Sequence, residues 1–271
     1  MSMKPSTSLS TCFVLFSFAV SFSAFGNEAK TIVDKLIDSR INLFESVSVR
    51  MRLLKADGTE REEPRLFSVS TYSPTRDVLK SLIIIKDPAS LRNAKILTVA
   101  SDGDKGQWLY LPSSKKVTRL NADSGDDSVF DSDLSFSDLK GENFDDFEYS
   151  MGDDRYIQYA QKECGEPAYS IIAKSKNKKS ASICRSRVLS ISKSKLTVCD
   201  VACFNSAGKP IKKIQNLEFI QKNKRWRPAR TVVTSYNNSR KVISKTELNY
   251  FDWKFSGKGN DSIFSPDALG R

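Results

Sequence analysis

The chain has 271 residues and a formal net charge of +11, with 39% hydrophobic and 28% charged residues. This length fits one β-rich domain or two smaller ones, and we predict a single domain over residues 27–271. There is no histidine, which excludes Ser-His-Asp and Cys-His catalysis, histidine-ligated zinc and histidine pH switching.

Residues 1–26 have the layout of a cleaved signal peptide. Lys4 is the single charge before an apolar, serine-containing run over residues 12–25, and this run is too short to span a bilayer. Residues 24–26 fit a small-x-small cleavage site. A lipid-attachment box ending at Cys12 is the weaker alternative, because the apolar run follows Cys12 instead of preceding it. We therefore predict an exported, periplasmic protein.

The first half of the mature chain is predicted to form one helix followed by strands. Residues 27–39 carry an apolar stripe at helical spacing, which predicts a short amphipathic helix packed on a sheet. From Glu45, apolar and polar residues alternate until a turn at Asp57 and Gly58. Further strands are expected at residues 66–72, 77–86 and 96–100.

The stretch from Trp108 to Gly141 joins a strand pair to an acidic segment. Residues 108–111 are β-prone and are ended by Pro112, which has no N–H for a ladder, and alternation resumes at residues 115–120, so we predict a hairpin. Residues 130–139 place apolar side chains at spacings of two to four, with aspartates between them. We expect a loop with short helical turns that lays aromatic side chains over an apolar surface.

The second half of the chain is predicted to return to strands. One more helical turn is expected at residues 143–149, followed by strands at 156–161 and 168–174 and by hairpins at 184–204 and 211–236. The chain then closes with a short helix that has Ser265 as its N-cap and Pro266 at its first position.

Four cysteines follow the leader, and an even number in an exported chain favours disulfides. If the hairpin at 184–204 turns midway, Cys184 lies opposite Cys203. Cys199 cannot reach Cys203 along one extended strand, because four residues span ~13 Å. We therefore predict the pair Cys184 and Cys203 and, by remainder, the pair Cys164 and Cys199. Free thiols or a local bridge between Cys199 and Cys203 across a bend are the alternatives.

Charge is unevenly distributed along the chain. Residues 123–154 contain twelve acidic residues and one basic residue, whereas residues 161–260 contain 22 basic and six acidic residues. For an exported protein we expect anionic lipid head groups, a partner or its own acidic loop as counter-charge, and no nucleic acid. A solvated surface is the alternative. The basic residues predicted to contact head groups or a partner are Lys174, Lys176, Arg185, Arg187, Arg225 and Arg227.

The acidic stretch does not predict a metal site or an active site. Its aspartates are oxygen ligands close together in the sequence, but the glycine and glutamate of an EF-hand are missing at the required spacing. No carboxylate pair stands in a setting typical of glycoside hydrolysis. We predict a protein that is not an enzyme and has no cofactor.

Several sequence blocks resemble the outer membrane lipoprotein-sorting protein family, which is LolA-like. Residues 107–112 (QWLYLP), 115–119 (KKVTR) and 130–139 (FDSDLSFSDL) are similar to successive family blocks. Further blocks follow in the family's order, and residues 246–248 (TEL) resemble its last strand, so the resemblance covers roughly residues 45–269. The sequence departs from the family at Asn93 and Ala94, where Gly and Thr usually stand, although Asn tolerates positive φ better than most residues.

The resemblance implies an α+β fold that is mainly β, with a strongly curved antiparallel sheet that forms an unclosed half-barrel. An N-terminal helix and short helices in a lid would cover the concave face. Such proteins carry a lipid or lipoprotein cargo in an apolar groove towards the outer membrane. The predicted groove and lid residues are Val49, Met51, Leu53, Leu82, Ile84, Leu97, Trp108, Tyr110, Phe130, Leu134, Phe136 and Leu139.

The family resemblance also suggests partners. We expect a monomer that touches the membrane surface transiently and is loaded by an inner-membrane transporter of the resistance-nodulation-division (RND) type. The alternative is an envelope sensor or structural protein that uses the same sheet to bind a protein partner and carries no lipid.

Overall fold

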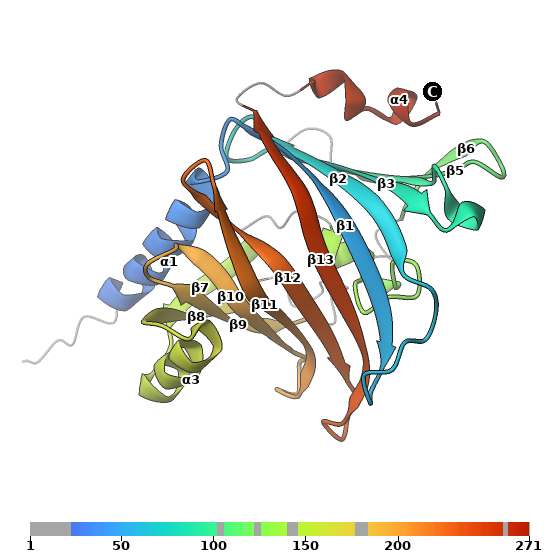
Figure 1. Ribbon diagram of the computed structural model, residues 1–271. Helices are drawn as coiled ribbons and strands as arrows, with labels where there is room; N and C mark the ends of the chain where they lie inside the picture. The colour runs from blue at the N-terminus through green and yellow to red at the C-terminus, as the bar shows by residue number, and fades with distance from the viewer. Residues whose placement is uncertain are drawn as a thin grey trace, which may run out of the picture.

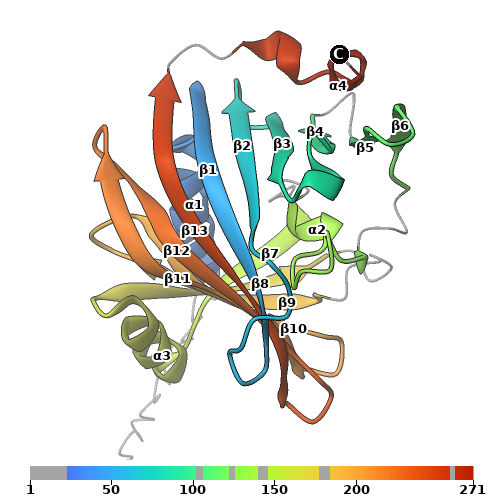
Figure 2. The same ribbon diagram turned by 45° about the vertical axis from the view of Figure 1, so that its right-hand side comes forward.

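The computed structural model describes residues 23–101, 106–121, 126–139, 146–176, 184–256 and 260–270, with side chains from residue 28 onward. Within these ranges thirteen strands form one continuous antiparallel sheet (Figure 1). The sheet curls without closing into a barrel, which confirms the predicted fold class (Figure 2). The predicted leader lies outside the described residues except for residues 23–26.

The chain builds this sheet from two meanders that meet at its first and last strands. The first meander consists of β1 (Leu43–Lys55), β2 (Arg65–Ser73), β3 (Leu79–Asp87), β4 (Lys95–Ala100), β5 (Gly106–Leu111) and β6 (Lys116–Arg119). The second consists of β7 (Phe147–Met151), β8 (Ala168–Ser175), β9 (Ser186–Ser192), β10 (Thr197–Phe204), β11 (Pro210–Lys222), β12 (Arg225–Tyr236) and β13 (Val242–Ser256).

The strand order places one pair of consecutive strands, β6 and β7, at opposite edges of the sheet. It runs β6-β5-β4-β3-β2-β1-β13-β12-β11-β10-β9-β8-β7, so β1 pairs with β13 in the middle. Strands β6 and β7 follow one another in sequence, yet each forms one edge. The connection between them therefore has to cross the whole width of the sheet.

Helix α1 (Ser23–Asp38) confirms the predicted N-terminal helix. Its apolar stripe, which includes Ile32 and Val33, packs against Ile171 of β8 and Ile191 of β9. Figure 2 shows α1 behind β1 and β13, inside the curve of the sheet, whereas α3 lies outside it. Helix α1 thus fills part of the concave face at the β7 edge.

The segment predicted as a strand at residues 156–161 is instead helix α3 (Asp154–Cys164), so this prediction is wrong. The Asp153 carboxylate accepts hydrogen bonds from the backbone N–H groups of Arg155 at 3.1 Å and Tyr156 at 3.2 Å, which caps the first turn. Gly165 has a φ of 66° and ends the helix in the left-handed conformation. These two end signals outweigh the β propensity of the tyrosines.

The helical turn predicted at residues 143–149 is wrong for residues 147–149, which belong to strand β7, whereas Asp146 just before them has a 3-10 conformation. Phe147, Tyr149 and Met151 alternate with more exposed residues in strand β7. Alternation with a period of two is the pattern of a half-buried strand. The prediction relied on Phe144 and Phe147 being three residues apart, and Phe144 lies outside the described residues.

The hairpin of β9 and β10 forms as predicted, but in another register. Ile191 lies opposite Val198 instead of Leu196, and Arg187 lies opposite Cys203. A register shift separates Val198 from Asp200. Because a bulge moves the pairing of all residues beyond it, counting back from an assumed turn gives the wrong partners.

Two local features adopt the predicted backbone. Asn93 has a φ of 67°, in the left-handed region that asparagine tolerates. Helix α4 (Pro266–Leu269) has Pro266 in its first turn, and the Ser265 hydroxyl accepts a hydrogen bond from the Ala268 N–H at 3.3 Å. Other short elements are the 3-10 turns η1 (Ala89–Leu91) and η4 (Asp261–Ile263) and the short helix α2 (Phe136–Leu139).

Candidate functional site

Residues 126–139 of the connection between β6 and β7 lie on the concave face, and we call them the strap. It contains α2, and both figures show it inside the curve of the sheet (Figures 1 and 2). The strap occupies the position predicted for a lid with short helical turns. Its acidic residues come from the stretch whose charge differs most from the rest of the chain.

Apolar side chains of the strap pack on the first half of the concave face. Val129 is buried at 3% exposure, and partly buried Phe130, Leu134, Phe136 and Leu139 contact the same cluster. The cluster's strand residues are Val47, Val49, Met51, Leu53, Phe67, Ile83, Ile96, Leu248 and Trp253. Seven of the twelve predicted groove and lid residues therefore meet here: Val49, Met51, Leu53, Phe130, Leu134, Phe136 and Leu139.

The structure places the other five predicted groove residues on the opposite face of the sheet. Leu82, Ile84, Leu97, Trp108 and Tyr110 form a separate cluster with Phe264 and Leu269 from the C-terminal segment. Their sequence neighbours Ile83, Ile96 and Leu109 face the strap instead. Successive side chains of a strand point to opposite faces, so a nearly continuous apolar run does not reveal which half faces the groove. This placement corrects the prediction.

A buried carboxylate anchors the strap to β13. Asp133 is 8% exposed. Its Oδ2 accepts a hydrogen bond from the Thr246 hydroxyl at 2.8 Å, and its Oδ1 accepts one from the Ser244 hydroxyl. The backbone N–H of Asp133 in turn donates to Thr246 Oγ1 at 2.8 Å. The strap is thus fixed to the middle of the sheet by reciprocal bonds that have little access to water.

Two further contacts fix the ends of α2. Gln107 Nε2 of β5 donates to the Phe136 carbonyl at 2.9 Å. Lys212 Nζ of β11 lies 2.5 Å from Asp138 Oδ2, and both side chains are mostly buried. One contact is with β5 of the first meander and the other with β11 of the second, so the strap links the two halves of the sheet.

The turn that precedes Asp133 uses an unusual backbone. Phe130 and Asp131 have φ angles of 50° and 55°, in the left-handed region that L-residues adopt at some cost. Two arginine side chains stabilise this turn by hydrogen bonds to its carbonyl groups. Arg65 donates to the Phe130 carbonyl, and Arg61 Nη2 donates to the Asp131 carbonyl at 2.8 Å. This turn aims the Phe130 side chain at the strand cluster.

On the second half of the concave face the strap leaves a pocket of about 350 Å³, which we call the groove. Its apolar wall comes from β10 and β11 and includes Val201, Ile211 and Ile214. Its polar residues include Asp138 of the strap and Arg187 of β9. The groove therefore offers one apolar wall and a charged rim, in contrast to the filled half beside it.

The groove contains one of the six basic residues predicted to contact head groups or a partner. The Arg187 guanidinium lies 4.9 Å from the ring centre of Phe147, and its Nε donates to Cys184 Sγ at 3.3 Å. Burial lowers the pKa of Arg187, and the nearby Asp138 carboxylate opposes that shift. Arg187 is thus a partly desolvated cation beside the strap.

The other five predicted basic contacts are divided between two places. Lys174 is exposed on β8, and Lys176 and Arg185 flank residues that lie outside the described ranges. At the other end of the sheet Arg225 donates to the Ser39 carbonyl, and Arg227 pairs with Glu45. The last two residues bind the protein itself, so this corrects their predicted role as contacts for a head group.

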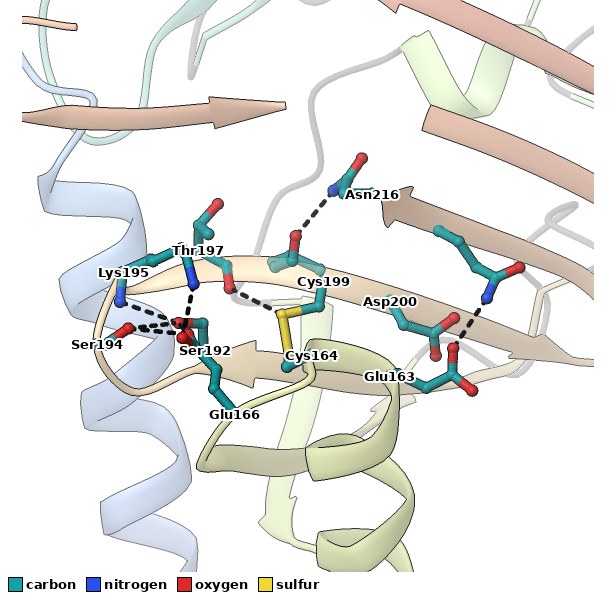
Figure 3. The surroundings of a disulfide bond; sticks show 12 residues. Glu163, Cys164, Glu166, Ser192, Ser194, Lys195, Thr197, Cys199, Asp200 and Asn216 are labelled. Atoms are coloured by element: carbon teal, nitrogen blue, oxygen red, sulfur yellow. Dashed lines mark hydrogen bonds and ion pairs between the residues drawn. A yellow bond between two sulfur atoms is a disulfide. The ribbon is translucent and has the colours of Figure 1, made fainter. Parts of the chain in front are cut away.

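Two disulfides join the elements of the second meander. Cys164 at the end of α3 is bonded to Cys199 of β10, with the Cα atoms 5.3 Å apart (Figure 3). Cys184 is bonded to Cys203, with a Cα separation of 5.5 Å, and both residues line the groove. Both predicted pairings are confirmed, although Cys184 lies before β9 and not opposite Cys203 in the ladder.

Neither a cluster of metal ligands nor a membrane-spanning helix occurs among the described residues. No three Cys, Asp or Glu side chains among them are close enough to hold a metal ion together. None of the helices within the described ranges is long and apolar enough to cross a membrane.

Three solved structures share this architecture, each at 20% sequence identity. A domain from Vibrio parahaemolyticus, described as an outer membrane lipoprotein-sorting protein domain, matches with a TM-score of 0.76 and covers 91% of this chain and 100% of its own. A DUF1329 family protein from Desulfovibrio piger matches with a TM-score of 0.74, covering 91% and 98%. A LolA superfamily protein from Nitrosomonas europaea gives 0.63, covering 88% and 98%.

A protein-family model described as "uncharacterized protein" matches residues 77–271. The chain belongs to that family. No curated protein matches the chain. The LolA-like fold that the sequence blocks imply is confirmed, since structures with the same fold include a LolA superfamily protein and a lipoprotein-sorting domain. In this LolA-like fold the strap and α1 both pack on the concave face, and the groove is the pocket between the strap and strands β10 and β11.

Proposed function

We propose that this LolA-like protein is a non-enzymatic periplasmic carrier that binds acyl chains of a lipid or lipoprotein on the concave face of its sheet. The observation that carries the proposal is the strap, which packs on the concave face and leaves the groove beside it. An apolar wall opposite a charged rim suits a ligand with a hydrocarbon chain and a polar head.

The size of the groove limits how much cargo fits while the strap is closed. About 350 Å³ is at the low end of the range for ligand pockets. Each buried methylene contributes about 0.8 kcal/mol, so one acyl chain binds only moderately. We propose that longer or multiple chains enter when the strap lifts and Phe130 and Phe136 leave the strand cluster.

The surroundings of the groove suggest how cargo is handed over. Arg187 would meet an anionic head group at the rim, and Lys174 would meet an anionic membrane surface beside the β7 edge. We propose export through the predicted signal peptide, action as a monomer and loading by an inner-membrane RND-type transporter. The two disulfides suit an oxidising compartment such as the periplasm.

The test is native mass spectrometry, with lipid extraction, of protein purified from its own periplasm. We expect wild-type protein to carry co-purifying lipid or lipopeptide. Val201→Trp should abolish this adduct, because Val201 lines the groove and the indole would fill it.

Ala202→Trp is the matched control, because Ala202 is the next residue on β10 and faces the other side of the sheet. This variant should retain the adduct. If wild-type protein carries no lipid, and its Trp fluorescence does not respond to added acyl ligands, the carrier proposal fails. The sheet would then serve to bind a protein partner.

A further inference from the structure

A second pocket lies on the outer face of the sheet, beneath helix α3. It has a volume of about 590 Å³ and lies between α3 and the neighbouring ends of β9, β10, β11 and β12. Val188, Ala202, Phe204 and Pro210 contribute to its apolar surface. We call it the α3 pocket.

Tyrosines and cations surround this apolar surface. Tyr156, Tyr159 and Tyr236 line the α3 pocket, and Tyr156 is unusually exposed for a large ring at 37%. Four basic residues, including Arg155 and Arg240, also line it, and none of the described lining residues is acidic. Three of these cations already pair with a carboxylate outside the lining: Arg155 with Asp153, Lys212 with Asp138 and Lys213 with Glu163. A hollow with aromatic walls and a cationic lining favours a ligand that has an apolar body and a negative group.

The walls of the α3 pocket are held in place by contacts beneath them. The Tyr159 hydroxyl donates to Asp200 Oδ2 at 2.9 Å, and Asp200 is completely buried. Lys213 Nζ lies 5.3 Å from the centre of the Tyr159 ring and 3.0 Å from Glu163 Oε2. A side chain fixed by a buried hydrogen bond loses little further entropy when a ligand binds, so the pocket is preorganised.

Helix α3 itself is fixed at both ends. The Asp153 carboxylate caps its first turn, next to the pocket residues Arg155 and Tyr156. The disulfide between Cys164 and Cys199 ties its last residue to β10 (Figure 3). The helix therefore keeps a constant distance from the sheet, and the hollow between them is a lasting feature of the molecule.

We propose that the α3 pocket is a second binding site, separate from the groove, for a small amphiphilic carboxylate such as a single-chain fatty acid. The chain lies on the surface around Ala202 and Phe204, against the tyrosine rings. The carboxylate meets Arg155 and Arg240 at the rim. A pocket of about 590 Å³ is in the usual range for one small ligand.

The α3 pocket and the groove share Lys212 and Tyr236 at their borders, but the sheet separates their apolar walls. Ala202 lines the α3 pocket and Val201 lines the groove, although they are consecutive residues of β10. Adjacent residues of a strand point to opposite faces. One substitution at each position therefore blocks one site and leaves the other open.

The test is titration of the delipidated full chain with laurate, followed by isothermal titration calorimetry. We expect wild-type protein to bind laurate, Ala202→Trp to lose at least tenfold in affinity and Val201→Trp to retain binding at the α3 pocket within twofold. Dodecanol has the same chain without the charge and should bind at least threefold more weakly than laurate. Arg240→Asn should remove most of that difference.

Three results would overturn the proposal: no laurate binding by wild-type protein, equal affinity of wild-type protein and Ala202→Trp, or loss of binding in Val201→Trp alone. The last result would assign laurate to the groove. If Ala202→Trp does not fold by circular dichroism, Tyr156→Ser at the exposed rim takes its place, with an expected loss of at least threefold. Native lipid in the groove is a separate measurement, so either proposal can fail without the other.

Discussion

Replacing the buried carboxylate of Asp133 should release the strap from the sheet. Asp133→Ala removes two hydrogen bonds between a carboxylate and the hydroxyls of Ser244 and Thr246. A hydrogen bond to a charged group contributes about 1.5–3 kcal/mol, and the hydroxyls left behind are poorly hydrated. We expect the free energy of unfolding to fall by about 3–5 kcal/mol. Asp133→Asn keeps one accepting oxygen and should lose about half as much.

Urea denaturation monitored by circular dichroism measures this loss, and hydrogen exchange locates it. The Val129 N–H, which donates to the Leu134 carbonyl at 2.7 Å, should exchange faster in Asp133→Ala. Asp127→Asn is the control, because Asp127 is an exposed aspartate of the same strap. It should change the free energy of unfolding by less than about 0.5 kcal/mol. Equal midpoints for Asp133→Ala and Asp127→Asn would refute the role of Asp133 as an anchor.

Three further predictions concern the second meander. Replacing Cys164 and Cys199 together by Ser should lower the free energy of unfolding by about 2–4 kcal/mol in urea, since their disulfide closes a loop of 35 residues; an unchanged midpoint would contradict this. Burial raises the pKa of Asp200 to about 6, although Lys213 and Tyr159 act in the opposite direction. The pKa of the same carboxyl in the unfolded chain is about 4. The stability that protonated Asp200 contributes is therefore fully present below about pH 4 and is lost as the pH rises through about 6. Asp200→Asn should flatten that dependence in urea midpoints measured from pH 4 to 8, and a profile parallel to wild type would count against it. Gly165→Ala should cost about 1–2 kcal/mol in thermal unfolding because of the φ of 66°, whereas Gly165→Asn should cost less; equal losses would show that the cap conformation is not limiting.

Alternation and apolar content predicted most strands, because each strand has one face against a core. They could not predict which side chains of β3 and β4 face the strap. On β3, for example, Leu82 and Ile83 are both buried, but they belong to clusters on opposite faces of the sheet. The difference arises because the C-terminal segment covers the outer face with Phe264. Only the arrangement in space shows which apolar neighbour faces the strap.

The signals for α3 were present in the sequence but were local and weak. Asp153 and Gly165 stand at the correct positions for an N-cap and a left-handed C-cap, eleven helical residues apart. Between these two positions Tyr156 and Ile157 have a high propensity for strands, so propensity alone predicts a strand there. The α3 pocket was consequently not foreseeable, because it requires a helix on the outer face.

The anchor of the strap shows a different limit of sequence reasoning. Asp133 belongs to a block that resembles the family, so its importance could be suspected, yet its partner Thr246 is 113 residues away. Thr246 belongs to a block that resembles the last strand of the family, but nothing in that block indicates a contact with Asp133. The register between β1 and β13 determines that Thr246 lies beneath the strap.

The pairing of β1 with β13 also sets the order in which the sheet can assemble. Arg52 and Glu247 form an ion pair across these two strands and are 195 residues apart in sequence. Hairpins between consecutive strands close short loops and form rapidly, whereas long-range pairing is slow because of its loop-closure entropy. Each meander is able to nucleate on its own, but the central seam has to wait for the last strand to be made. Until then two unpaired inner edges are open to other chains, which makes the nascent protein vulnerable to aggregation at its future centre.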